Sequence, residues 1–254
     1  MTVTRIVNET IWITGASSGI GRALAIRLAQ QGNTVIASAR SSEALNDLAA
    51  QQGNIIALPF DVTDVDSIER TRAAIERCTG HLNRIILNAG NCEYLDIDNP
   101  DWSMMQRVMD INYNGAINSL VVAMPLLKNT PQHRPHIIAV ASLAAVVPFH
   151  RAEAYGASKA AIQYFFDALR LDLADKNVDV TVINPGFVKT PLTDKNDFQM
   201  PFLQALDTAA MRMAQAIAKR PPQYDFPRRL AWLLRVLGFC PHIWNQWVAP
   251  RLKN

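Results

Sequence analysis

Short runs of apolar and β-branched residues alternate along the chain with longer stretches whose apolar residues recur at helical spacing. In the stretch from Arg22 to Gln31, for example, Leu24 and Leu28 fall on one helical face. Strands that alternate with helices pair in parallel through right-handed crossovers, so helices cover both faces of the sheet. The pattern therefore predicts an α/β fold built on a doubly wound parallel sheet. The six predicted strands are Thr10 to Thr14, Thr34 to Ala37, Asn54 to Leu58, Arg84 to Asn88, His136 to Ser142 and Asp179 to Asn184.

The character of the chain changes after Thr190, where prolines divide the sequence into short pieces. No repeat, low-complexity block or Gly/Ser linker precedes residue 190. We therefore predict a single domain over residues 1–254, with a core of about 1–190 and a substrate cap and C-terminal extension of about 191–254.

Charge and cysteine content exclude several classes of protein. The 254 residues carry 25 Lys and Arg against 22 Asp and Glu, a net charge of +3, which is too small to indicate a nucleic-acid partner. The three cysteines are Cys78, Cys92 and Cys240, and their spacing predicts neither a disulfide framework nor a metal site. The N-terminus does not read as a signal peptide, and no uncharged apolar run approaches the roughly 18 residues of a spanning helix. A cytoplasmic, reducing location is expected.

A glycine-rich loop connects the first strand to the first helix. Gly15, Gly19 and Gly21 are spaced G-x-x-x-G-x-G within Thr14 to Arg22. A strand that runs into such a loop and opens a helix presents free backbone N–H groups and the positive end of the helix dipole, which together hold a pyrophosphate. The loop alone is also compatible with a glycine-rich turn that binds nothing.

Three polar residues are expected to meet near the fifth strand. Tyr155 and Lys159 are four residues apart within a predicted helix, so one helical face carries both. Ser142 ends the fifth strand, at the edge where α/β sheets place their ligand crevices. The pair Tyr155 and Lys159 on its own could be a coincidence on the surface.

With these motifs in order, the chain resembles the short-chain dehydrogenase/reductase family, and within it an NADP-preferring carbonyl reductase. The resemblance runs from Thr10 to about Thr190 and is looser beyond. It implies a Rossmann-type sheet and hydride transfer between NADP(H) and a carbonyl or alcohol. The matching motifs are Thr14 to Gly21, Asn88-Ala89-Gly90, Asn112 in the context Asn-x-x-Gly, the set Ser142, Tyr155 and Lys159, and Pro185-Gly186-Phe187-Val188-Lys189-Thr190.

The resemblance also implies which residues contact the cofactor. The glycine loop would hold the phosphates, Asp61 and Val62 the adenine, and the segment after the sixth strand the nicotinamide carboxamide. The expected cofactor-binding residues are Gly15, Ser17, Ser18, Gly19, Ile20, Gly21, Arg40, Asp61, Val62, Asn88, Ala89, Gly90, Tyr155, Lys159, Pro185, Gly186, Val188 and Thr190.

Four residues are expected to be catalytic. Hydride delivery to a carbonyl carbon leaves charge on the oxygen, which needs a proton donor and a second hydrogen bond. Tyr155 would supply the proton, Ser142 the second hydrogen bond, and Lys159 would lower the pKa of Tyr155 from its ordinary value near 10. By the family pattern, Asn112 would bend its helix and hold a water that relays protons toward Lys159.

The second strand ends in Ala39-Arg40, which bears on the choice of cofactor. An acid at this place would bind the ribose 2′-OH of NAD, whereas a neutral residue followed by Arg accommodates the 2′-phosphate of NADP. NADP(H) is therefore expected in preference to NAD(H). The other interpretation is that Arg40 is a solvated loop residue.

Apolar residues should border the substrate, which favours a lipophilic compound, although residues of this kind also fill cores. The candidates are Leu143, Val147, Phe149, Phe187, Leu192, Phe198, Met200 and Phe202.

The C-terminal extension from Arg228 to Asn254 has five basic residues, no acid and three of the chain's five tryptophans. Its leucines at 230, 233, 234 and 237 form a helical stripe opposite Arg228 and Arg235. Such a helix packs on its own protein or on another subunit, or it lies on a membrane surface, and the sequence leaves these alternatives open. The family's usual glycine-rich seventh strand and tail are absent, so we expect a dimer rather than the family's common tetramer.

The resulting prediction is an NADP(H)-dependent oxidoreductase that acts on a small, lipophilic carbonyl or alcohol. Two rivals remain: an epimerase or dehydratase on the same scaffold, and a regulatory module that binds NADP(H) without catalysis. The complete set of Ser142, Tyr155 and Lys159 argues against the regulatory module, because a sensor needs no proton donor.

Overall fold

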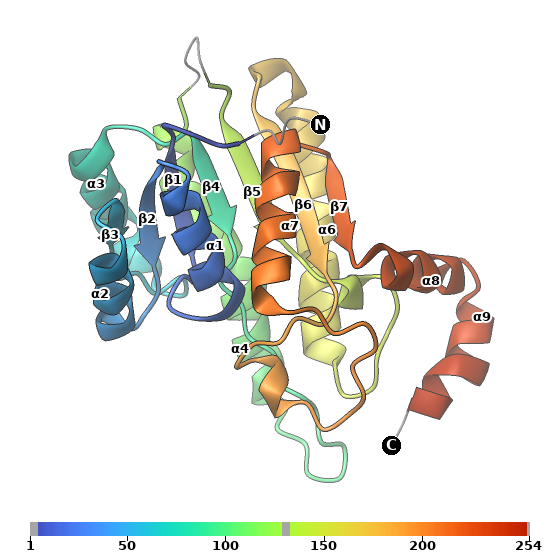
Figure 1. Cartoon of the computed structure of the whole chain (residues 1–254). Coiled ribbons are helices and arrows are strands. Elements are labelled where there is room, and N and C mark those ends of the chain that lie inside the picture. The colour runs from blue at the N-terminus through green and yellow to red at the C-terminus, as the bar shows by residue number, and fades with distance from the viewer. Residues whose placement is uncertain (1–4, 129–132, 253–254) are drawn as a thin grey trace.

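A seven-stranded, all-parallel sheet in the order β3-β2-β1-β4-β5-β6-β7 forms the centre of the protein (Figure 1). This computed structural model describes residues 5–128 and 133–252. The six predicted strands are confirmed, with ends shifted by at most two residues. The strands are β1 (Thr10–Thr14), β2 (Thr34–Ser38), β3 (Ile55–Ala57), β4 (Arg84–Leu87), β5 (His136–Val140), β6 (Asp179–Pro185) and β7 (Gln223–Phe226).

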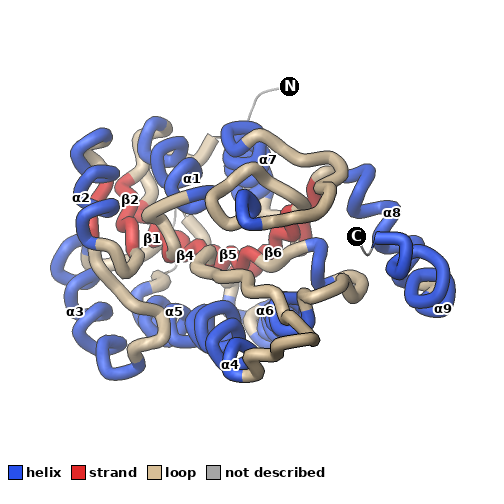
Figure 2. The backbone as a smooth tube through the Cα atoms, turned by 90° about the horizontal axis from the view of Figure 1, so that it is seen from below, coloured by secondary structure: helices blue, strands red, loops and turns tan. Residues whose placement is uncertain are grey.

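Helices cover both faces of the sheet, as the view along it shows (Figure 2). On one face lie α1 (Gly19–Gln30), α2 (Ser42–Gln51) and α7 (Leu206–Lys219). On the other lie α3 (Ile68–Thr79), α5 (Gly115–Ala123) and α6 (Glu153–Asp172), with α4 (Ser103–Met109) packed against α6. Two short helices, α8 (Arg228–Gly238) and α9 (Pro241–Ile243), project beyond the β7 edge (Figure 1). The predicted doubly wound α/β fold is confirmed.

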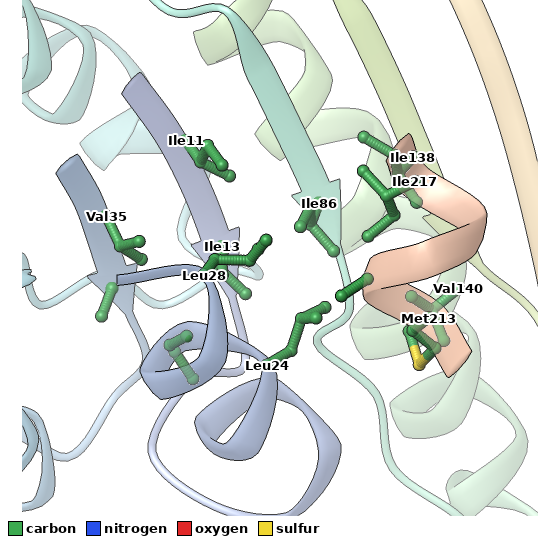
Figure 3. Packing of buried hydrophobic residues seen from close by; sticks show 14 of the residues in the cluster. Ile11, Ile13, Leu24, Leu28, Val35, Ile86, Ile138, Val140, Met213 and Ile217 are labelled. Carbon is green, nitrogen blue, oxygen red and sulfur yellow. The ribbon is translucent and has the colours of Figure 1, made fainter. Parts of the chain in front are cut away.

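Alternation of side chains along the strands builds two separate cores. Ile11 and Ile13 of β1 face α1, where they pack with Leu24 and Leu28 (Figure 3). Trp12, between them, points to the opposite face and joins the cluster that contains α3, α5 and α6. Because strand side chains alternate with a period of two, a strand buried on both faces must be apolar at consecutive positions.

A seventh strand is present, although it does not contain the glycines that are usual in the family and that the sequence lacks. Residues Gln223–Phe226 form β7, which pairs in parallel with β6, and Phe226 is fully buried. Helix α7, which precedes β7, contributes Met213 and Ile217 to the same core as α1 (Figure 3). The four residues between Pro222 and Pro227 are too short a run to be recognised as a strand from the sequence pattern. Pairing along the edge of β6 stabilises this short strand.

Candidate active site

A cavity of about 610 Å³ opens at the carboxyl ends of the central strands. Loops that follow strands β1 to β6 contribute its walls, as expected where the strand order reverses. Two predicted site residues, Gly21 and Asn112, are not among those that line it. The others do line it: Gly15, Ser17, Ser18, Gly19, Ile20, Arg40, Asp61, Val62, Asn88, Ala89, Gly90, Ser142, Tyr155, Lys159, Pro185, Gly186, Val188 and Thr190.

Two glycines of the loop leave no room for a side chain. A Cβ atom on Gly15 would lie 2.7 Å from the Cα of Ala89, and one on Gly21 would lie 2.2 Å from the carbonyl oxygen of Gly15. Gly15 also has a φ of +69°, which residues with a side chain rarely adopt. Gly21 therefore shapes the loop from behind, and the first-turn N–H groups of α1 remain available to a ligand in the cavity.

Asn88 fastens this loop to the neighbouring strand. Its side-chain amide donates to the carbonyl oxygens of Thr14, at 3.1 Å, and Gly15, at 3.2 Å. The Thr14 hydroxyl in turn accepts from the backbone N–H groups of Asn88 and Ala89. Asn88 thus has a structural role in addition to its position on the cavity wall.

Arg40 is exposed at the far end of the cavity, beside Ala39 and Ser41. Asp61 also lines this end, and its carboxylate accepts from the backbone N–H and the hydroxyl of Thr63, at 3.0 and 2.8 Å. Phe60 lines it too, although no sequence motif pointed to that residue.

Helix α6 and the end of β5 bring Ser142, Tyr155 and Lys159 together. The Ser142 side chain is close enough to the phenol of Tyr155 to lower its pKa, and its hydroxyl accepts from the backbone N–H of Ala144 at 3.1 Å. The Nζ atom of Lys159 lies 5.7 Å from the centroid of the Tyr155 ring. The residues that the sequence placed thirteen and four positions apart are therefore neighbours in one wall of the cavity.

Burial controls the ionisation of both residues of the pair. It raises the pKa of Tyr155 to about 12, while the nearby Ser142 hydroxyl acts to lower it. It also lowers the pKa of Lys159 to about 8. The pKa of Tyr155 is thus raised and not lowered as expected, because desolvation of the phenolate is its largest cause and Lys159 is not among the causes of the shift. At neutral pH Tyr155 is a neutral phenol with a proton to donate.

Asn112 lies behind the catalytic wall, fully buried in one π-helical turn, Asp110–Asn114, between α4 and α5. The predicted irregularity of the helix is present. Its amide nitrogen donates to the Asn91 carbonyl at 2.9 Å and to the Ser158 hydroxyl at 2.8 Å, and its oxygen accepts from the Asn91 N–H at 2.7 Å. Because both amide protons are used in this way, the side chain ties the loop after β4 to helix α6.

The segment after β6 is held in place by Thr193. Its hydroxyl accepts from the backbone N–H of Thr190 at 2.9 Å and donates to the carbonyl of Val188 at 2.7 Å. Val188 and Thr190 are thereby fixed against the cavity. Thr193 and Lys195 both line the cavity, and neither stood in a motif that the sequence offered.

Only Leu192 of the eight apolar substrate candidates lines this cavity. Leu143 and Val147 are buried instead against α8 and Trp244. Phe198 packs edge-on against Phe187, with ring centroids 6.0 Å apart. Of the apolar candidates, Leu192 thus lies at the cavity, whereas Leu143 and Val147 belong to the core beneath the C-terminal extension. The position of α8 determines which of them can reach the cavity.

A set of polar contacts that the sequence did not reveal, here called the clamp, joins the segment after residue 190 to the loops that follow β4 and β5. The Tyr94 hydroxyl donates to the side-chain oxygen of Asn196 at 2.7 Å. Arg151 pairs with Asp197 at 2.7 Å and lies over the Tyr94 ring, 5.4 Å from its centroid. These contacts join residues about 50 to 100 positions apart, so no local pattern signals them.

Comparison with known proteins agrees with this arrangement. A family model described as short chain dehydrogenase matches residues 9–200. The chain belongs to the short-chain dehydrogenase family.

Its relatives are named as oxidoreductases. The chain is 35% identical over 250 residues to an uncharacterised oxidoreductase of Myxococcus xanthus (strain DK1622), covering 96% of this chain and 98% of that protein. It is 29% identical over 251 residues to 11-beta-hydroxysteroid dehydrogenase-like 3 of Arabidopsis thaliana, and the match covers 94% of this chain and 79% of that protein. The fold also matches a crystal structure of 3-ketoacyl-(acyl-carrier-protein) reductase from Brucella melitensis complexed with NADH, with a TM-score of 0.79 and 22% sequence identity. The match covers 87% of this chain and 97% of that chain. This protein is an oxidoreductase of the family.

Proposed function

We propose that the protein is an NADP(H)-dependent reductase of a lipophilic ketone or aldehyde. The observation that carries the proposal is the neutral Tyr155 phenol beside Ser142 in the wall of a cavity that the glycine loop also lines. A proton donor at this place suits reduction, in which the substrate oxygen gains a proton.

The residues present fit a dinucleotide. The absence of side chains at Gly15 and Gly21 lets the loop pack closely on its neighbours, and a pyrophosphate in the cavity would face the first-turn N–H groups of α1. When bound, the cofactor supplies the hydride. Val188 and Thr190, held by Thr193, would position its nicotinamide end, and Lys159 would contact its ribose.

The protein's own groups complete the reaction at the substrate oxygen. Tyr155 gives its hydroxyl proton to that oxygen, and Ser142 donates a hydrogen bond that stabilises the developing negative charge. Asn112 acts as a positioning residue, because it fixes Asn91 and Ser158 on either side of the site.

Arg40 supports the preference for NADP(H). It lines the open end of the cavity beside Ala39, so no carboxylate stands at that position to repel a 2′-phosphate. A guanidinium forms bidentate, charge-assisted hydrogen bonds to a phosphate and can stack on adenine.

The substrate class is supported by Leu192 at the cavity and by the pair Phe187 and Phe198 next to it. The Arabidopsis relative named for a hydroxysteroid, a lipophilic alcohol, points in the same direction.

The test is the loss of NADPH absorbance with a panel of carbonyl compounds of increasing chain length. We expect turnover that rises with chain length and an alcohol product in equal amount to the NADPH consumed. Tight NADPH binding without turnover of any carbonyl would support a regulatory module, and product formation without net NADPH consumption would support an epimerase or dehydratase.

A further inference from the structure

The C-terminal extension, residues 228–252, packs one side against the body of the protein. Leu230, Leu234 and Trp244 are buried in a third apolar cluster with Leu143 and Val147. The indole N–H of Trp244 also donates to the carbonyl of Pro148 at 2.8 Å. Most of the leucine stripe that the sequence suggested for an external partner is therefore used internally, and Leu233 alone among its four members is exposed.

The opposite side of the extension presents a second set of apolar residues to solvent. Trp232 and Val236 on α8 and Phe239 directly after it follow at helical spacing, and the exposed fractions of Trp232 and Phe239 are 68% and 87%. The extension has six exposed apolar residues, which we call the aromatic face: Trp232, Leu233, Val236, Phe239, Ile243 and Trp247. Six exposed apolar residues within sixteen positions are an unusual concentration for a protein surface, and such concentrations mark sites of interaction.

Charge identifies the kind of partner. Residues 228–251 contain four arginines and no acid. Arg235 is paired with Asp225 at 2.6 Å, whereas Arg228 and Arg229 are exposed and form no ion pair with any residue that the structure describes. Arg251 lies against the ring of Trp247, 5.8 Å from its centroid. The aromatic face is thus bordered by unneutralised positive charge.

A second copy of this chain is a poor occupant of such a face. A symmetric dimer would bring the same patch of both copies together, so arginines would meet arginines with no acid within residues 228–251 to offset them. A bilayer that contains anionic lipid offers apolar tails to the aromatic residues and negative headgroups to the arginines at the same time.

We infer that the aromatic face docks the protein on the surface of an anionic phospholipid membrane. Trp232, Phe239 and Trp247 enter the boundary between headgroups and tails, and Arg228 and Arg229 contact the headgroups. The contact is peripheral: among residues 5–128 and 133–252, no helix is long and apolar enough to cross a bilayer. The buried side of the same helix reaches the cavity wall, because a Cβ atom on Gly186 would lie 3.0 Å from Leu230.

Flotation of the full-length protein with lipid vesicles tests this inference. We expect binding to vesicles of phosphatidylcholine mixed with phosphatidylglycerol, much weaker binding to phosphatidylcholine alone, and release from the mixed vesicles at high salt. The absence of binding to the mixed vesicles, or equal binding to both compositions, would overturn it.

Two double variants separate the apolar from the charged contribution. Trp232→Ser with Phe239→Ser should weaken vesicle binding by about tenfold or more, because apolar area no longer leaves water. Arg228→Gln with Arg229→Gln should weaken it about 25-fold, since each arginine near an anionic surface contributes about fivefold, or ~1 kcal/mol. Trp102→Ser is the matched control: Trp102 is 58% exposed, as Trp247 is, but directly precedes α4, which lies apart from α8 and α9 (Figure 2), and its loss should leave binding unchanged.

Further measurements keep the result interpretable. The thermal unfolding midpoint and the turnover of a water-soluble carbonyl should not change in either double variant, because the side chains are exposed and outside the catalytic wall. Sedimentation of the unmodified protein and of the Trp232→Ser, Phe239→Ser variant should give the same mass. A change from dimer to monomer in that variant would mean that the face binds a second copy, and would overturn the membrane assignment. Failure of the proposed reductase function alone would show as lost turnover with vesicle binding intact.

Discussion

The ammonium group of Lys159 donates a hydrogen bond to the carbonyl oxygen of Val140 at 3.0 Å, which joins helix α6 to the last residue of strand β5. This bond holds the lysine below the Tyr155 ring and away from bulk water. Burial favours the neutral form of both side chains. The same packing therefore lowers the pKa of Lys159 and raises the pKa of Tyr155.

Replacing Tyr155 with Phe should abolish most of the turnover and leave NADPH binding intact. The ring and its packing remain, but the transferable proton is lost, which for general acid catalysis costs about 10²- to 10⁴-fold in rate. Single-turnover rates and NADPH fluorescence measure the two effects. Tyr164→Phe is the control, because Tyr164 lies on the same helix, is 81% exposed and should tolerate the change without effect. Activity above a tenth of the unmodified protein's would contradict the role of Tyr155.

The pH dependence of kcat/KM for NADPH should report Lys159. Its pKa is lowered to about 8, so the ammonium is present below that pH and is lost as the pH rises through it. We therefore expect kcat/KM to be level below pH 8 and to fall toward tenfold per unit above it. Lys159→Met should give a low value with no such limb. A profile of the unmodified protein that stays flat to pH 10 would contradict the lowered pKa.

Cofactor preference should depend on Ala39 and Arg40. Charge-assisted hydrogen bonds contribute about 1.5–3 kcal/mol, which predicts a roughly 10- to 100-fold preference for NADPH in kcat/KM. Arg40→Ala should weaken NADPH alone and leave NADH kinetics unchanged. Ala39→Asp should reverse the preference, because the new carboxylate accepts from the ribose 2′-OH of NAD and repels the 2′-phosphate. Equal kcat/KM for both cofactors in the unmodified protein would refute the role of Arg40 and leave that of Tyr155 untouched.

A buried polar chain at the opposite ends of the strands controls stability rather than chemistry. Arg84 of β4 pairs with Glu9 and donates to Nδ1 of His136 at 2.7 Å. Since a guanidinium only donates hydrogen bonds, Nδ1 of His136 is the acceptor and Nε2 carries the ring proton. The Nε2–H group then donates a hydrogen bond to the Thr181 hydroxyl at 2.8 Å. Thr181 then donates to the carbonyl of Pro221 at 2.6 Å. His136 must be neutral for the chain to close.

Acid should therefore destabilise the protein through His136. Burial, reinforced by Arg84, lowers its pKa well below 6.5 in the folded state, whereas the unfolded chain takes up a proton near pH 6.5. The unfolded state binds more protons between those two values, so the free energy of unfolding should decrease as the pH falls below 6.5, by up to about 1.4 kcal/mol per unit. Urea unfolding from pH 8 to pH 5 measures it. His136→Gln, which cannot gain a proton, should be less stable at pH 8 but show a shallower decrease, and an unchanged slope would exclude His136 as the cause.

The sequence alone determined the sheet up to β6 and most of the cavity wall. Strands that are apolar at consecutive positions, a glycine loop before α1 and the spacing of Tyr155 and Lys159 are local patterns, and parallel pairing then brings the strand ends together. These rules, together with the resemblance to the family, predicted that Ser142, Tyr155 and Lys159 lie in one wall.

Tertiary structure decided whatever depends on contacts between distant segments. Strand β7 exists because β6 offers an edge, and the clamp between Tyr94 and Asn196 spans 102 positions. Burial reversed the expected shift of the Tyr155 pKa, because solvent exclusion is a property of the packed core and not of a helical turn. The same holds for α8: its sequence shows that the helix is amphipathic, but only packing against Leu143 and Val147 determines which side is buried, and so which arginines and aromatic residues face solvent.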